Sequence, residues 1–83
     1  MIKLLNTLKD SGMVCLYLGS LMSSDNLLSP DDCDRAIKLL NETIEAVPES
    51  DFSEEEKEKI INYCKDGIAI VESDKKEFLK NIN

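Results

Sequence analysis

The sequence predicts an all-α fold, a small three-helix bundle in which a helical hairpin packs against an apolar N-terminal helix. Three observations support this prediction: two strong helix-start signals, three stretches with apolar residues spaced three and four apart, and no stretch with the alternation of a β-strand. We expect helices near residues 2–23, 30–46 and 54–82, with a break in the first or the last. A chain of 83 residues is expected to form one domain, 1–83.

The longest periodic stretch is 54–82. Ser53 and Glu56 have the spacing of a capping box, in which each side chain bonds the backbone N–H of the other residue. Gly67 costs roughly 1 kcal/mol relative to alanine inside a helix, and residues 73–74 offer a second start signal, but we expect one helix, straight or bent. Its apolar stripe consists mainly of Ile60, Ile61, Cys64, Ile68, Val71, Phe78, Leu79 and Ile82.

The middle helix has equally clear ends. Ser29 is the expected N-cap, and Pro30 suits the first helical position. Pro48 disfavours helical backbone at the residue before it and should end the helix. We expect this helix and the start of the last one to form an antiparallel hairpin with a short loop. The predicted core of the hairpin is Ile37, Leu40, Ile44, Ile61, Ile68 and Val71.

The first stretch is apolar around nearly its whole circumference, which is typical of a helix buried on several sides. Residues 10–12 read Asp-Ser-Gly and mark the point where a break is expected. Gly12 and Gly19 lie on one face, where they would allow a second helix to approach closely, although a helix also tolerates glycines that have no such role. The apolar run 13–22 is too short to cross a bilayer, and no membrane association is expected.

Charge is unevenly distributed along the chain. The net charge is −7; residues 25–58 carry twelve acidic and three basic residues, or −9, against +2 for the rest. Direct nucleic-acid binding needs clustered Lys and Arg and is therefore not expected. A protein partner with a basic surface fits this charge, although solubility alone would also account for it. The residues expected to bind that partner are Asp31, Asp32, Asp34, Asp51, Glu54, Glu55 and Glu58.

The residues needed for common catalytic or metal chemistry are missing. The chain has no His, and its three cysteines, Cys15, Cys33 and Cys64, have no metal-ligand spacing and lie among apolar neighbours. We therefore expect no enzyme activity, no catalytic residues, no metal and no cofactor. Three widely spaced cysteines also argue against a secreted disulfide framework and for a reducing, cytoplasmic location.

Three function classes remain. The first is a small binding protein of the inhibitor, immunity, anti-defence or adaptor type, which would use its acidic segment. The second is a self-assembling structural or regulatory protein, and a homo-oligomer is expected because a chain this small leaves apolar surface uncovered. Its predicted oligomer interface includes Leu16, Leu18 and Phe78. The third is a small-ligand binder with an intersubunit pocket near Tyr17 or Tyr63.

Overall fold

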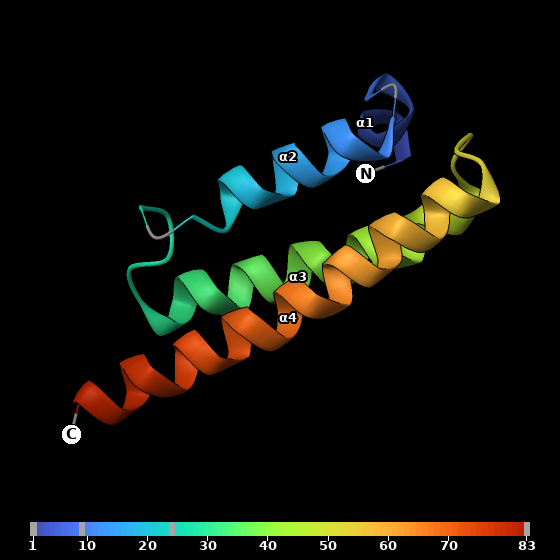
Figure 1. Ribbon diagram of the computed structural model, residues 1–83. Coiled ribbons are helices and arrows are strands. Elements are labelled where there is room, and N and C mark those ends of the chain that lie inside the picture. Colours follow the sequence, from blue (N-terminus) through green and yellow to red (C-terminus); the bar gives the residue numbers. More distant parts are fainter. Residues whose placement is uncertain (1, 9, 24, 83) are drawn as a thin grey trace.

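The computed structural model describes residues 2–8, 10–23 and 25–82, and over these residues the chain is all-α (Figure 1). The expected first helix is divided in two, whereas the other two occupy the predicted ranges. In the described residues there are four α-helices and one short 3-10 helix, without a strand: α1 (Ile2–Thr7), α2 (Ser11–Leu21), α3 (Pro30–Ala46), the 3-10 helix η1 (Val47–Glu49) and α4 (Glu54–Ile82).

The break between α1 and α2 lies at Asp10, as the sequence predicted. Asp10 has extended backbone, and its carboxylate accepts a hydrogen bond of 2.8 Å from the backbone N–H of Met13, so it is the N-cap of α2. The helix therefore restarts in a new direction at Ser11, and Leu5 of α1 enters the core separately from Val14 and Leu18 of α2.

Two hydrogen bonds between side chains and backbone N–H groups fix the start of α3. The Ser29 hydroxyl accepts a hydrogen bond of 3.3 Å from the Asp32 backbone N–H, and the Asp32 carboxylate accepts one of 3.0 Å from the N–H of Leu28. α3 ends at Ala46, and the chain continues through Pro48 as η1. Both predicted ends of this helix are confirmed, but Val47, the residue before Pro48, keeps helical backbone (φ −56°, ψ −43°), so the expected steric effect of the proline on that residue is not what ends the helix.

The last helix is continuous, and its capping box differs from the predicted one. The Ser53 hydroxyl accepts a hydrogen bond of 3.2 Å from the Glu56 N–H, as expected. The Glu56 carboxylate instead accepts bonds from the Ser53 hydroxyl (3.3 Å) and from the backbone N–H of Ser11 (3.0 Å), at the start of α2. One carboxylate thus lies at the positive ends of two helix dipoles and ties α2 to α4.

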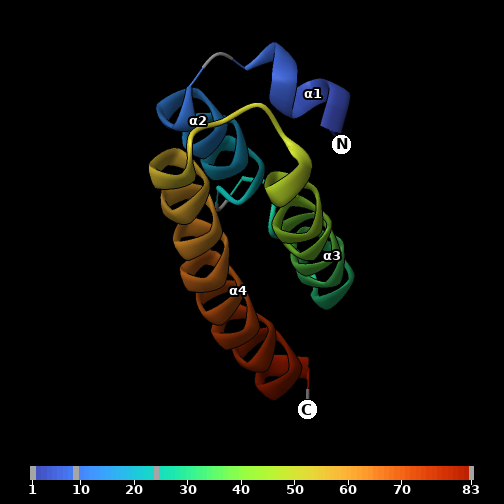
Figure 2. The ribbon, with the colours of Figure 1, turned by 90° about the vertical axis from the view of Figure 1, so that its right-hand side faces the viewer.

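α3 and α4 form an antiparallel hairpin, and α2 lies over one face of that hairpin and runs parallel to α4 (Figures 1 and 2). Lys75 of α4 donates a hydrogen bond of 2.6 Å to Asp34 near the start of α3. The parallel register of α2 and α4 is set by the Ser11–Glu56 bond at one end and by the contact of Met22 with Gly67 further along. The molecule is elongated, 46 × 18 × 16 Å, and the C-terminal end of α4 extends past α3.

The core follows a line on α4 that is rotated from the predicted one. Leu40 and Val71 are buried as predicted, at 0% and 1% exposure. The other four predicted core residues are only partly buried at its edge: Ile37, Ile44, Ile61 and Ile68. Because α2 and α3 both pack on α4 and share one core cluster with it, the fully buried line passes through Ile60 and Cys64 instead. A first cluster contains Leu5, Val14, Leu18, Leu40, Val47, Ile60 and Cys64, and a second contains Leu27, Cys33, Ala36 and Val71.

Candidate interaction surfaces

The seven acidic residues predicted to bind a partner do not form one surface. Those at the start of α3 are Asp31, Asp32 and Asp34, and those at or just before the start of α4 are Asp51, Glu54, Glu55 and Glu58. The hairpin is antiparallel, so these two groups lie at its opposite ends. α3 has 17 residues, which separates them by about 25 Å at 1.5 Å per residue.

The carboxylates at the start of α3 serve the fold itself. Asp32 bonds the Leu28 N–H and pairs with Arg35 at 3.5 Å. Asp34 pairs with Lys75 across the hairpin, and this hydrogen bond, followed by the negative charge of Asp34, raises the pKa of Lys75. Asp32 and Asp34 therefore have partners within the chain. Of the three, Asp31 is the one that is exposed and whose carboxylate makes no hydrogen bond to the described residues.

The other end of the hairpin is densely acidic. The side chains of Glu54 and Glu55 are 94% and 83% exposed. Among the described residues here, the opposing cations are Lys3 on α1, Lys57, which pairs with Glu54 at 3.5 Å, and Lys59, which pairs with Glu55 at 3.9 Å. We call this region the acidic end; its carboxylates are Asp10, Glu49, Asp51, Glu54, Glu55, Glu56 and Glu58.

Sequence reasoning missed Asp10 as a member of the acidic end. Asp10 lies 15 residues before the start of the acidic segment at Asp25, in a stretch that reads as apolar. The bond between Glu56 and the Ser11 N–H brings the start of α2 against the start of α4 and carries Asp10 with it. The only signal for this contact is the N-cap spacing from Asp10 to Met13, which places a helix start but gives no partner for it.

An apolar face on α2 remains exposed. Met13, Leu16 and Tyr17 are 48%, 73% and 37% exposed, and their spacing places them on one side of the helix. We call this surface the outer face of α2. Leu18, predicted to lie in an oligomer interface, is 1% exposed in the first core cluster and offers no surface to another chain. Phe78, also predicted there, packs against the second core cluster and is only partly accessible.

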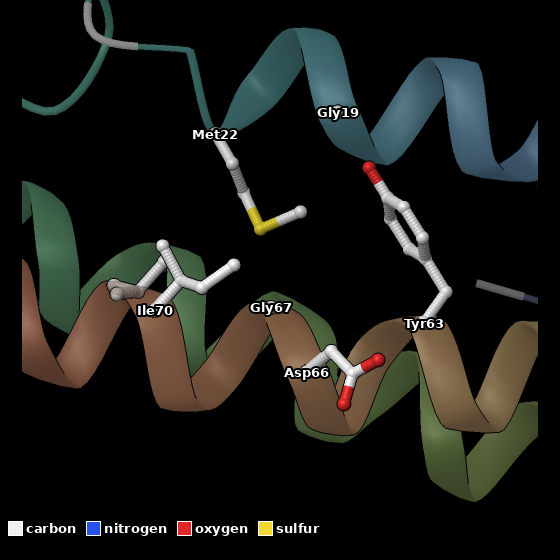
Figure 3. Close-up of a pocket in the computed structure, with 7 residues that line it drawn as sticks. Gly19, Met22, Tyr63, Asp66, Gly67 and Ile70 are labelled. Atoms are coloured by element: carbon white, nitrogen blue, oxygen red, sulfur yellow. The ribbon is translucent and has the colours of Figure 1, made fainter.

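A pocket of about 360 Å³ lies between α2 and α4 (Figure 3). It is close to Tyr63, one of the two tyrosines singled out in the sequence, but both walls belong to one chain, whereas an intersubunit pocket was predicted. Its lining is mainly apolar, with the Asp66 side chain as its charged group. The lining residues are Gly19, Met22, Tyr63, Asp66, Gly67, Ile70 and Val71.

The cysteines are free, and two of them are fully buried. Burial, with a smaller effect of the Cys15 thiolate charge, raises the pKa of Cys64 to about 11, and burial raises the pKa of Cys33 and Cys15 as well. The thiolate is the reactive form of cysteine, so these side chains behave at neutral pH as small apolar groups. Across the described ranges, no group of three or more His, Cys, Asp or Glu residues is placed to hold a metal ion.

Comparisons with known proteins found no relative. No protein-family model, curated protein or solved structure matches the chain. In the part of the chain that the structure describes, none of the helices combines the length and the apolar character needed to cross a membrane.

Proposed function

We propose that this chain is a non-enzymatic binding protein, of the inhibitor, immunity, anti-defence or adaptor type, whose acidic end docks on a basic surface of a protein partner. The observation that carries the proposal is the convergence of seven carboxylates on one end of the molecule. They come from the N-cap of α2, from η1, from the following loop and from α4. Four of them are residues the sequence singled out: Asp51, Glu54, Glu55 and Glu58.

Exposed charge of one sign acts mainly on the rate of association. An acidic surface attracts a basic one before contact and orients the encounter, so it raises the on-rate more than it slows dissociation. The range of this attraction is the Debye length, which falls from about 10 Å at 0.1 M salt to about 3 Å at 1 M. Binding through the acidic end is therefore expected to weaken steeply with salt.

Reversing two charges of the acidic end tests the proposal. Asp51 and Glu58 are exposed, and neither carboxylate has an ion pair in the described ranges, so Asp51→Lys with Glu58→Lys should leave the fold intact. We expect a tenfold or larger loss of on-rate. Proteins captured from extracts of the native cells at low salt, identified by mass spectrometry, provide the partner; surface plasmon resonance with that partner then gives the rates.

The matched control makes the same change of charge elsewhere. Glu72→Lys with Glu77→Lys alters two exposed residues in the second half of α4, the nearer of them about 21 Å along the helix from Glu58 at 1.5 Å per residue. This variant should bind the partner nearly as fast as the natural protein does. Equal losses in the two variants would mean that net charge, rather than the acidic end, governs binding, and binding that neither salt nor either variant weakens would refute the proposal.

Self-association is a second candidate, favoured by the outer face of α2. A surface leucine that is 73% exposed beside Met13 and Tyr17 forms an apolar patch that a second copy could cover.

Leu16→Glu should convert the assembly into monomers, because the glutamate would place a charge in the contact. Sedimentation equilibrium at micromolar concentration should give a mass near twice 9.3 kDa for the natural protein and 9.3 kDa for the variant. Leu28→Glu is the matched control, since Leu28 is 71% exposed but lies in the loop before α3. A natural protein of 9.3 kDa would exclude this candidate.

A further inference from the structure

The pocket between α2 and α4 exists because each helix presents a glycine to a large side chain of the other. Tyr63 of α4 reaches α2 at Gly19, where an added Cβ would lie 2.8 Å from the Tyr63 hydroxyl oxygen. Met22 of α2 covers Gly67 of α4, where an added Cβ would lie 3.1 Å from the Met22 sulfur. The pocket lies between these two contacts, and Figure 3 shows Tyr63 and Met22 on either side of it.

The walls of the pocket define the chemistry of a ligand. Met22 and Ile70 give apolar surface on one side, and the Tyr63 ring gives an aromatic surface on the other (Figure 3). An aromatic ring attracts a cation, and a methionine sulfur packs well against an aromatic group. Asp66 carries the charge in this lining, its side chain is exposed, and it has no ion pair or hydrogen bond among the described residues. No lining residue is basic.

We infer that this pocket binds a compact organic cation, an aromatic or alkyl group that carries a protonated amine. The apolar group lies between Met22 and Tyr63, in contact with Ile70, and the ammonium group lies beside the Asp66 carboxylate and the Tyr63 ring. The volume of about 360 Å³ is at the small end of ligand pockets, which span roughly 300–1,000 Å³, so the ligand is small. The negative charge of Asp66 and the net charge of −7 disfavour anions.

A pair of probes that differ only in charge tests the inference. 2-Phenylethylamine is protonated at pH 7, and 2-phenylethanol is its neutral counterpart. In ¹H–¹⁵N correlation spectra, the amide signals of Gly19 and Gly67 should move on addition of either probe, with tighter binding of the amine. Gly12, the third glycine of the chain, lies two turns before Gly19 on α2, and its amide signal should not move. Shifts confined to the amine, but scattered over the whole acidic surface, would overturn the site.

Variants separate the two halves of the ligand. Asp66→Asn should weaken binding of the amine roughly three- to fivefold and leave the alcohol unchanged, because a single exposed carboxylate contributes modestly. Ile70→Ala should weaken both probes. Glu72→Gln, which removes an exposed carboxylate that does not line the pocket, is the control and should change neither. Equal affinity of the two probes, or an amine affinity that Asp66→Asn leaves unaltered, would refute a cation site.

Discussion

Replacing Leu40 with alanine should lower the free energy of unfolding by about 2–5 kcal/mol. Leu40 is 0% exposed in the first core cluster, and its Cδ1 atom would lie 3.3 Å from a Cβ added at Gly67, so its side chain fills the space where α3 meets α4. Truncation leaves a cavity among α2, α3 and α4, which the surrounding side chains close only in part. Against a total stability of about 5–15 kcal/mol for a small domain, this loss threatens folding.

Urea denaturation followed by far-UV circular dichroism gives the loss directly. Leu16→Ala is the control, because Leu16 is 73% exposed and its truncation should change the free energy of unfolding of the monomer by less than about 0.5 kcal/mol. Ile44→Ala should lower the free energy of unfolding by an amount between those of Leu40→Ala and Leu16→Ala, since Ile44 is only partly buried. A loss at Leu40 no greater than that at Leu16 would contradict the packing of the hairpin.

Raising the pH from 9 to 11 should destabilise the natural protein by about 2 kcal/mol more than it destabilises Cys64→Ala. Burial raises the pKa of the Cys64 thiol from 9.0 to about 11, so the folded state keeps a proton that the unfolded state loses. The stability that this provides is complete below pH 9 and is lost as the pH rises toward 11. The figure is an upper value, because relaxation and water entry would stabilise the thiolate in the folded state.

The comparison with Cys64→Ala isolates the titration of Cys64 together with its charge coupling to Tyr63, whose pKa is raised first by burial and then by the Cys15 and Cys64 thiolates. The lysines, the tyrosines and the other two cysteines are common to both proteins, and the cavity left by the substitution shifts the curve without changing its slope with pH. Urea denaturation at half-unit steps of pH measures both curves. Parallel curves would show that the Cys64 thiolate reaches water in the folded protein, in conflict with its 0% exposure.

Short-range signals in the sequence determined the helices. The extended N-caps at Asp10 and Ser29 and the serine before Glu54 act on the few residues next to them, through hydrogen bonds that need no tertiary partner. Pro48 acts equally locally, because it has no N–H with which to continue the helical hydrogen bonds. For this reason the all-α class, the break in the first helix and the ranges of α3 and α4 could be predicted from the residues alone.

The tertiary structure decided which sides of those helices meet. Periodicity locates an apolar stripe on α4 but does not show that both α2 and α3 pack against it. With two helices packed on α4, the fully buried residues are Ile60 and Cys64, and Ile61 and Ile68 are only partly buried. Likewise, the sequence placed Glu56 in a local cap, whereas the packed helices give its carboxylate a second donor 45 residues away, at Ser11.

The candidate sites depend on this long-range packing even more. In the sequence, the seven carboxylates predicted to bind a partner lie in one acidic segment. The antiparallel hairpin places Asp31 and Glu58 at opposite ends of the molecule, and the packing of α2 places Asp10 at the same end as Glu58. The pocket arises where Gly19 and Gly67, 48 positions apart, each receive a side chain from the other helix. Composition and spacing fix what each residue can do, and contacts between distant parts of the chain fix which residues act together.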